Sequence, residues 1–333
     1  MTTEPIRWGV LGASSFARGA TAPAIHAARG CTLAAIATRD PAKADPFAAF
    51  APGLRVHDDY DALLADRDVD AVYIPLPHDM HVPWGIKALE AGKHALIEKP
   101  LALGADDIAP LIHARDRTGL QCAEAFMVAH HPQWAHVRGL LADGAIGRLR
   151  HVEGRFAYNN ADDPGNIRQQ ARHGGGALPD VGVYVMGATR LATGAEPEAI
   201  TSAVVDWEAG CDVLARIGAR FPTSEGGFTA HWLVGMRLAR TQGMTFHGEA
   251  GEIRVATPFT PPGSGEARVD LVAGREARTW RWPGVAQYVL QMEAFAAAIR
   301  GEAAFPWTLE DARGTQRAID MAYAAAGGRP AVA

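Results

Sequence analysis

The chain has 333 residues, of which 48% are apolar and 21% are charged, and its formal net charge is -5. This composition is typical of a globular protein that is large enough for two domains with separate cores. No basic block is present that could neutralise several phosphates, so the sequence excludes nucleic acid as the main partner.

Membrane insertion and disulfide bonding are not indicated either. No run of about 18 apolar residues is present to span a bilayer, and the first five residues lack the basic and apolar regions of a secretion signal. We therefore expect a cytoplasmic protein without membrane contact. Cys31, Cys122 and Cys211 are far apart and lack CxxC spacing, so buried reduced thiols are expected rather than disulfides or a zinc site.

The first third of the chain alternates between strand and helix patterns. Strands are predicted at 6–12, 31–37, 71–75, 93–98 and 121–126, and helices at 16–29, 41–50, 61–65, 82–91 and 106–118. Pro23 is expected to kink or delay the first of these helices. Repeated strand and helix units of this length predict a parallel sheet with helices on both faces.

After about residue 150 the pattern changes to strands with little helix between them. Strands are predicted at 151–158, 199–207, 212–221, 227–233, 242–247 and 251–255, helices at 179–193, 288–300 and 309–326, and a Pro- and Gly-rich loop at 258–265. The expected fold class is therefore α/β, with a parallel-sheet domain over 1–125 and an α+β domain over 126–333. The second sheet is expected to be open and mostly antiparallel, and the C-terminal helix to pack back on the first domain.

The first chemical motif is the turn after the first predicted strand, which reads Gly12-Ala13-Ser14-Ser15-Phe16-Ala17. Backbone N–H groups at a helix N-terminus bind anions, and a small residue in the turn lets a pyrophosphate approach. Ser14 occupies the place of the second glycine in the GxGxxG/A pattern, so the match is imperfect. The strand, turn and helix context still favours a dinucleotide site that uses Gly12, Ser14, Ser15 and Phe16.

The end of the second predicted strand discriminates between the dinucleotide cofactors. NAD sites usually place an acidic residue there for the ribose 2′-OH, whereas Thr38 and Arg39 offer a hydroxyl and a guanidinium that suit a 2′-phosphate. Lys43, one turn later, is placed to support the same phosphate. NADP is therefore the expected cofactor, and Asp40 leaves NAD open as the alternative.

Two further motifs carry polar residues that suit hydride transfer. Glu98-Lys99-Pro100 follows an apolar strand, and a glycine run at 174–176 leads to Asp180 and Tyr184. Asp180 and Tyr184 are four residues apart, so they share one helix face.

Together with 124–127, 131–134 and 164–168, these motifs resemble the glucose-fructose oxidoreductase / inositol dehydrogenase (Gfo/Idh/MocA) family over nearly the whole chain. The resemblance implies an N-terminal Rossmann domain and a C-terminal domain whose open sheet builds homodimers or homotetramers. It also implies a nicotinamide-dependent oxidoreductase. With a tyrosine rather than a histidine at position 184, the chain resembles the family branch that contains the D-xylose dehydrogenases and dimeric dihydrodiol dehydrogenase. That branch mostly uses NADP.

The resemblance implies a role for each matching residue. Lys99 would lie near the nicotinamide and the reacting carbon, and Tyr184, as a phenolate stabilised by Lys99, would be the general acid/base beside Asp180. Asn166 and Arg168 would lie near the substrate hydroxyls. The cofactor would be surrounded by Leu76, His81, Glu98 and Tyr288, with Glu98 mainly supporting the lysine loop and Pro100 following a cis bond.

Some positions depart from the family pattern or fit other functions. Residues 128–130 read Val-Ala-His where the branch tends to have Tyr-Arg-Phe, which leaves the substrate open. The histidines at 78, 81, 130 and 131 lack a metal-ligand spacing, so no metal is expected. We expect an NADP-dependent oxidoreductase that acts on an aldose such as D-xylose or on a sugar-like diol. A catalytically silent NADP(H)-binding sensor or scaffold and a sugar-sugar oxidoreductase with tightly held NADP are the alternatives.

Overall fold

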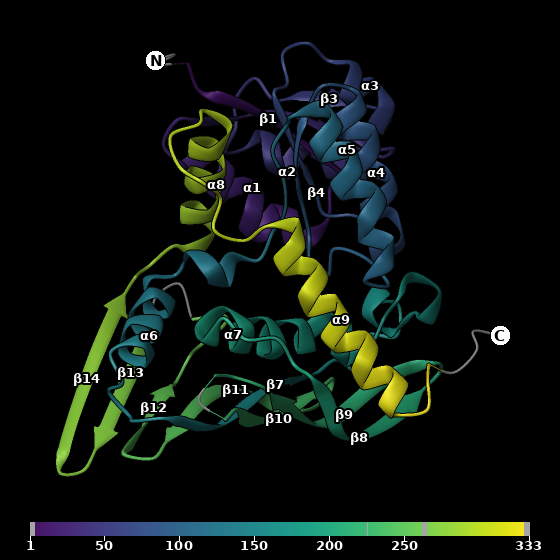
Figure 1. Cartoon of the computed structure of the whole chain (residues 1–333). Helices are drawn as coiled ribbons and strands as arrows, with labels where there is room; N and C mark the ends of the chain where they lie inside the picture. Colours follow the sequence, from purple (N-terminus) through teal and green to yellow (C-terminus); the bar gives the residue numbers. More distant parts are fainter. Residues whose placement is uncertain (1–3, 225, 262–264, 330–333) are drawn as a thin grey trace. The chain divides into compact units, whose positions relative to one another are not determined.

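The computed structural model describes residues 4–224, 226–261 and 265–329. The chain divides into two compact units, the first comprising Met1–His130 and Ala286–Arg313 and the second comprising His131–Val285 and Gly314–Ala333 (Figure 1). Residues 1–3 and part of the predicted loop at 258–265 lie outside the described residues. In the part of the chain that is described, no helix is long and apolar enough to cross a membrane.

The first unit contains a six-stranded sheet in which every strand pair is parallel, as predicted. The strand order is β3-β2-β1-β4-β5-β6, so the order reverses between β1 and β4. In sheets of this kind, ligands bind beyond the carboxyl ends of the strands at that reversal. The strands are β1 (Ile6–Leu11), β2 (Cys31–Ala37), β3 (Arg55–His57), β4 (Ala71–Ile74), β5 (His94–Ile97) and β6 (Cys122–Glu124).

Helices cover both faces of this sheet, with α1 and α8 on one side and α4 and α5 on the other (Figure 1). The first predicted helix begins with a π-helical turn at Ala17–Thr21, before α1. The fourth begins earlier than predicted, at His78. The helices are α1 (Ala22–Ala27), α2 (Asp45–Ala48), α3 (Tyr60–Ala65), α4 (His78–Glu90), α5 (Ala109–Thr118) and α8 (Gln287–Ile299).

Aromatic contacts explain why residues from the end of the chain belong to the first unit. The rings of Trp8 in β1 and Phe295 in α8 lie 5.4 Å apart, and both side chains are fully buried. Phe305 meets Phe295 edge to face at 5.4 Å. Burying one such side chain contributes about 1.5–3 kcal/mol, which is enough to fix α8 against the sheet.

The second unit contains an eight-stranded sheet of order β14-β13-β12-β11-β7-β10-β9-β8. All neighbouring pairs are antiparallel except β7 and β10, so the predicted mostly antiparallel sheet is confirmed. The strands are β7 (Leu149–Asn159), β8 (Ala199–Glu208), β9 (Cys211–Phe221), β10 (Phe228–Gly235), β11 (Arg237–Gly248), β12 (Gly251–Val255), β13 (Glu266–Ala273) and β14 (Glu276–Pro283).

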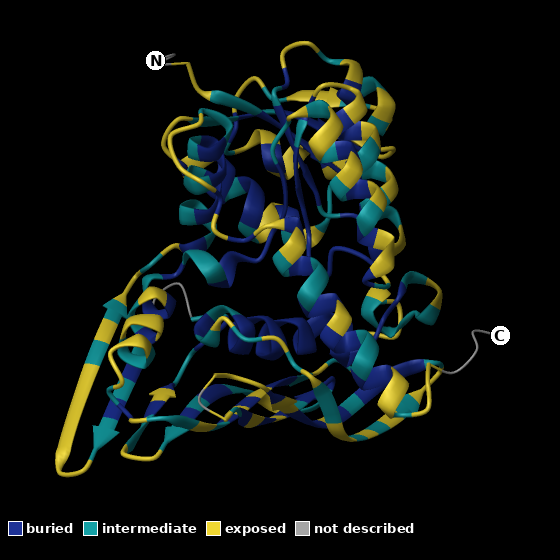
Figure 2. Cartoon of the chain, in the orientation of Figure 1, coloured by how far each residue is buried: buried dark blue, intermediate teal, exposed yellow. Residues whose placement is uncertain are grey.

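One face of this second sheet is covered by helices. Figure 1 shows α6 (Pro132–Ala142), α7 (Val183–Thr193) and the C-terminal part of α9 (Leu309–Ala325) along the same face. Buried and exposed residues alternate along β10, as expected for a strand with one covered and one open face (Figure 2).

Several elements escape the sequence prediction. Strand β3 has only three residues, and α6 is introduced by His131, which is not a common N-cap residue. The hairpin of β13 and β14 carries many charged residues, although Ala267, Val269 and Leu271 alternate toward the interior. Sequence patterns therefore find the long periodic elements and miss short or highly charged ones.

Candidate functional site

Gly12 forms the turn that follows β1. Its φ is +104°, in the region that favours glycine. A Cβ atom there would lie 3.2 Å from Leu76 Cδ2 and 3.4 Å from Tyr60 Oη. Leu76, a predicted cofactor residue, is buried beside the turn. The turn therefore selects glycine, as a pyrophosphate-binding turn does.

The predicted cofactor residues after Gly12 form the start of the first helix. Ser14 Oγ accepts a hydrogen bond from the Ala17 N–H at 3.0 Å, which caps the helical turn. Ser15 is exposed, and the half-buried ring of Phe16 meets Tyr288 of α8 edge to face at 6.0 Å. The structure thus brings Phe16 and Tyr288 together from opposite ends of the chain. A helix start of this kind fits an anionic pyrophosphate.

The end of β2 separates its acidic residue from its basic ones. Asp40 Oδ1 accepts a hydrogen bond from the Ala42 N–H at 3.2 Å and so caps a short helical turn. Thr38 Oγ1 accepts from the Asp40 N–H at 3.3 Å. Arg39 and Lys43 are exposed. Because the Asp40 carboxylate is engaged in capping, the groups that fit a ribose phosphate here are the two cations.

The lysine loop follows β5. Lys99 is buried, with 9% of its surface exposed. The Glu98 carboxylate accepts a hydrogen bond from the Lys99 N–H at 3.1 Å and another from the Tyr73 hydroxyl. The Lys99–Pro100 peptide bond is cis, as the family resemblance implies. Glu98 is thus hydrogen-bonded to the loop that it is predicted to support.

His81 is fully buried beside the same loop. Its Nδ1 lies 2.8 Å from the Pro100 carbonyl oxygen, and its Nε2 lies 2.8 Å from the Leu76 carbonyl oxygen. Burial lowers the pKa of His81 to about 4, so its imidazole is neutral at pH 7 and donates to one carbonyl at a time. His81 therefore contacts the backbone of the predicted cofactor residue Leu76 and of Pro100 in the lysine loop.

In the second unit, Tyr184 lies in the first turn of α7 and is 6% exposed. Its ring packs against Phe156 at 5.4 Å and Phe259 at 5.7 Å, and these two rings are themselves stacked at 5.0 Å. These two ring contacts hold the phenol ring of Tyr184 in one orientation.

Asp180 lies in the π-helical turn Leu178–Gly182, directly before α7. Its Oδ1 accepts a hydrogen bond from Arg168 Nε at 2.8 Å, and its Oδ2 accepts one from the Tyr158 hydroxyl at 2.6 Å. The Asp180 side chain is 6% exposed and that of Arg168 is 34% exposed. The Asp180 carboxylate therefore accepts hydrogen bonds from both Arg168 and Tyr158. Asp180 and Tyr184 lie in adjoining helical segments.

Tyr158 contacts the predicted site residue Asp180, and the sequence patterns do not single it out. Burial and the neighbouring Asp180 carboxylate raise the pKa of Tyr158, so the phenol stays protonated and donates. The same carboxylate raises the pKa of Arg168. Asn166 Oδ1 accepts the Arg168 N–H at 3.1 Å, so Asn166 shapes the local turn. The position of Tyr158 at the end of a predicted strand is the signal that could have found it.

The glycine run before Asp180 is required by close backbone packing. Gly174 and Gly176 have φ values of +72° and +140°. A Cβ at Gly175 would lie 2.5 Å from the Arg168 carbonyl oxygen, and a Cβ at Gly176 would overlap the Asp212 carboxylate. The run therefore lets the chain pass Arg168 and Asp212 and deliver Asp180 and Tyr184 to one helix.

Asp212, which sequence reasoning also missed, holds the start of this helix. It is fully buried. Its Oδ2 accepts the Leu178 N–H at 2.7 Å, and its Oδ1 accepts the Tyr323 hydroxyl at 2.6 Å. Burial raises the pKa of the Asp212 carboxyl to about 6, while the two donors act in the opposite direction.

The predicted site residues thus form two groups. The first unit holds the cofactor residues together with Glu98 and Lys99, and the second holds Asn166, Arg168, Asp180 and Tyr184. Among the described residues, no three His, Cys, Asp or Glu side chains are placed to hold a metal ion. The three cysteines are free, as expected.

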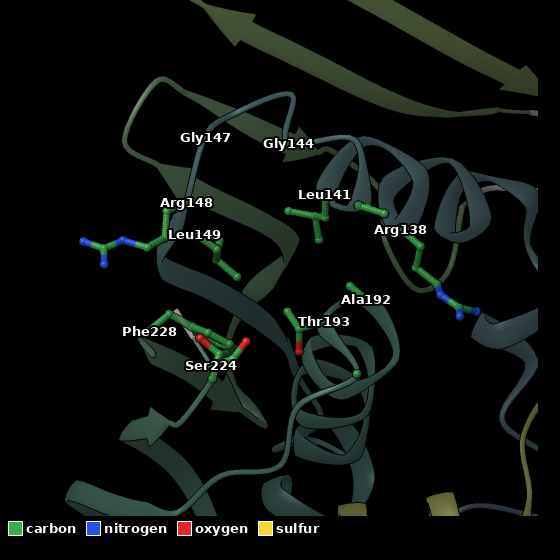
Figure 3. A pocket seen from close by; sticks show the side chains of 13 residues that line it. Arg138, Leu141, Gly144, Gly147, Arg148, Leu149, Ala192, Thr193, Ser224 and Phe228 are labelled. Carbon is green, nitrogen blue, oxygen red and sulfur yellow. The ribbon is translucent and has the colours of Figure 1, made fainter. Parts of the chain in front are cut away.

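A hollow of about 590 Å³ in the second unit contains none of the predicted site residues. Leu141, Leu149, Thr193 and Phe228 line it (Figure 3). Thr193 is the last residue of α7, whereas Tyr184 lies in the first turn, so the hollow is at the opposite end of that helix.

Comparison with known proteins identifies the family. Residues 6–126 match the oxidoreductase family with an NAD-binding Rossmann fold, and residues 134–254 match the GFO/IDH/MocA C-terminal domain. Since these ranges cover most of the chain, it belongs to the GFO/IDH/MocA oxidoreductase family, as the resemblance predicts. It is accordingly an NAD(P)-dependent oxidoreductase.

Two relatives of this chain are named for reactions on sugars. The chain is 36% identical over 311 residues to a dTDP-3,4-didehydro-2,6-dideoxy-alpha-D-glucose 3-reductase of Actinomadura kijaniata, covering 93% of this chain and 92% of that protein. It is 29% identical over 319 residues to a D-xylose 1-dehydrogenase (NADP(+)) of Haloferax volcanii, covering 96% and 97%.

The fold is shared with a solved structure. A 3-ketoreductase from Actinomadura kijaniata, in complex with NADP and TDP-benzene, is 35% identical, covers 95% of this chain and 96% of its own, and has a TM-score of 0.87. The expected nicotinamide cofactor is confirmed by this complex and by the NAD-binding description of the family.

The Asp212 contacts generate a testable prediction. Asp212→Asn should change the free energy of unfolding by less than about 1 kcal/mol, because asparagine can accept the Leu178 N–H and donate to the Tyr323 hydroxyl. Asp212→Ala should cost about 1–3 kcal/mol, because it leaves buried donors unpaired. Urea unfolding at pH 7 measures both variants, and equal losses would contradict the assignment of these bonds.

The pH dependence of the free energy of unfolding provides a second test of the Asp212 carboxyl. A carboxyl whose pKa is raised from 3.8 to about 6 contributes stability that is present below 3.8 and lost as pH rises to about 6. The free energy of unfolding should therefore fall less over this interval in Asp212→Asn than in the wild-type protein.

Proposed function

We propose that the chain is an NADP-dependent oxidoreductase that transfers a hydride between the nicotinamide and a carbon of a sugar, with Tyr184 as the general acid/base. The observation that carries the proposal is the anchored pair on one helix. Tyr184 is held by two phenylalanine rings, and the Asp180 carboxylate is fixed by Arg168 and Tyr158.

The proposed chemistry assigns one task to each group. Bound NADP would supply the hydride acceptor or donor at its nicotinamide ring. During oxidation Tyr184, as a phenolate, takes the proton of the substrate hydroxyl, and during reduction it returns that proton to the carbonyl oxygen. The Lys99 ammonium favours the phenolate and the negative charge that develops on the substrate oxygen. Arg168, one third exposed and oriented by Asp180, is placed to donate to a sugar hydroxyl.

NADP is proposed rather than NAD because of the charges after β2. Arg39 and Lys43 are exposed there, and the carboxylate of Asp40 is engaged as a helix cap. The relative crystallised with NADP supports the same choice.

Two kinds of sugar substrate are supported. The first is a free aldose such as D-xylose, or a sugar-like diol, as the sequence motifs predict. The second is a keto sugar linked to a nucleoside diphosphate, which is favoured by the higher identity to the dTDP-sugar 3-reductase, 36% against 29% for the xylose dehydrogenase. The altered stretch at 128–130 also favours a substrate other than D-xylose.

Absorbance at 340 nm tests the proposal and separates the substrates. Purified protein with NADPH should oxidise the cofactor when a dTDP-linked 3-keto sugar is added, or protein with NADP should reduce it with a pentose, hexose, inositol or diol. Turnover with one class only assigns the substrate. Tight NADP binding without turnover on any of these compounds would favour the silent sensor, and reduction of one aldose by another without added NADP would favour the sugar-sugar oxidoreductase.

The roles of Lys99 and Tyr184 predict specific losses. Lys99→Met and Tyr184→Phe should each lower turnover by at least ~10²-fold, because each removes a group that acts in the transition state, while NADP is still bound. Steady-state kinetics and NADPH fluorescence titration measure the two effects. Turnover like that of the wild-type protein in either variant would remove that residue from the mechanism.

Arg39 should determine the cofactor preference. Arg39→Ala is expected to raise the Kd of NADP far more than that of NAD, because only NADP carries the 2′-phosphate. Titration with both cofactors measures the ratio of the Kd of NADP to the Kd of NAD. The control is Arg18→Ala, which removes an exposed arginine of the first helix. Equal loss of affinity for NADP and NAD would show that Arg39 does not contact this phosphate.

Self-association through the open face of the eight-stranded sheet, as a homodimer or homotetramer, stays a prediction from the family resemblance.

A further inference from the structure

A second buried carboxylate, Glu124, lies at the end of β6 and has no role in the function proposed above. It is 1% exposed. Its Oε1 accepts the Leu101 N–H at 2.9 Å, and its Oε2 accepts the indole N–H of Trp307 at 2.9 Å. Leu101 is two residues after Lys99, so Glu124 bonds directly to the backbone of the lysine loop.

Side chains contact one backbone polar group at each of three successive residues of this loop. The Lys99 N–H donates to Glu98, the Pro100 carbonyl oxygen contacts His81, and the Leu101 N–H donates to Glu124. Because Pro100 lacks an N–H, the N–H groups of Lys99 and Leu101 are the two backbone donors of residues 99–101, and both are bound by carboxylates. The path of the chain around Lys99 is therefore set by Glu98 within the loop and by two side chains from other elements, His81 of α4 and Glu124 of β6.

Trp307 gives Glu124 its second donor and is itself held firmly. The indole is 2% exposed and packs on Phe126 with ring centroids 4.5 Å apart. Two N–H donors aimed at the two oxygens of one buried carboxyl favour its ionised form, because both oxygens of a carboxylate accept hydrogen bonds.

The surroundings of Glu124 shift its pKa in both directions. Burial and, to a smaller extent, the Glu98 carboxylate raise the pKa of Glu124, whereas the Trp307 and Leu101 donors and the Lys99 ammonium lower it, and together they bring it to about 7. Glu124 is thus close enough to Lys99 to sense its charge, and the two N–H donors oppose the cost of burying the carboxylate.

We propose that Glu124 and Trp307 are positioning residues for Lys99: the carboxylate, oriented by the indole, fixes the backbone after the lysine and so the place of its ammonium. This inference rests on the role proposed for Lys99. A shift of about 1 Å in a reacting group can lower turnover by about 10²-fold, so a positioning residue is expected to act on kcat.

Glu124→Gln tests the bonds with a change that preserves shape. A glutamine offers one oxygen and one NH2 group, yet both partners are N–H donors, so one donor must face the NH2 group. Trp307→Phe removes one of those donors. In the double variant Glu124→Gln/Trp307→Phe, the glutamine oxygen can accept the Leu101 N–H without opposition, and the loop should regain its place.

Amide exchange of Leu101 gives a readout that needs neither cofactor nor sugar. In protein labelled with [15N]leucine, Leu101 should be protected in the wild type, should exchange at least about tenfold faster in Glu124→Gln, and should regain protection in the double variant. Asp212→Asn is the matched control, since that buried carboxylate faces one N–H and one hydroxyl and tolerates an amide. It should leave Leu101 protection unchanged.

Kinetics supply the second readout. Glu124→Gln should lower kcat by about 10- to 100-fold with little change in the KM for NADP, and the double variant should recover to within about threefold of Trp307→Phe alone. Unchanged Leu101 exchange in Glu124→Gln, or loss of protection without recovery in the double variant, would overturn the proposal. Absence of turnover in the wild-type protein would instead defeat the proposed function, while the exchange experiment would still decide the contacts of Glu124.

Discussion

Buried carboxylates that accept hydrogen bonds hold the segments on which the predicted chemistry depends. Glu98, Glu124, Asp180 and Asp212 are all 9% exposed or less. A carboxylate removed from water is costly unless donors surround it, so each of these groups selects a definite arrangement of its neighbours. The acceptors bind backbone N–H groups at Lys99, Leu101 and Leu178, and side-chain donors at Arg168 and Tyr158.

The C-terminal segment supplies donors to two of these carboxylates. Trp307 donates to Glu124 within the first unit, and Tyr323 donates to Asp212 within the second. Both partners lie on or just before α9, which begins at Leu309. The segment therefore contributes to the lysine loop and to the start of the tyrosine helix, although it carries none of the residues that are proposed to contact substrate.

Most of the fold could be predicted from local patterns. The strand at 31–37 and the change from parallel to mostly antiparallel pairing follow from periodicity and from the spacing of the elements. Strand β3, helix α6 and the β13–β14 hairpin could not be predicted in this way. They are short, lack a usual cap or carry charges on their open face, so their stability comes from neighbours rather than from their own sequence.

The sequence by itself determined the chemistry on offer: a glycine turn after a strand, a basic pair after the next, a lysine after another, and an aspartate and a tyrosine one helical turn apart. Only the tertiary structure decided which groups hold these residues in place. The bonds of Glu124 to Trp307 and of Asp212 to Tyr323 join residues 183 and 111 positions apart. No local pattern can encode such a pair, because a buried carboxylate finds its donor only when the folded chain brings the two together.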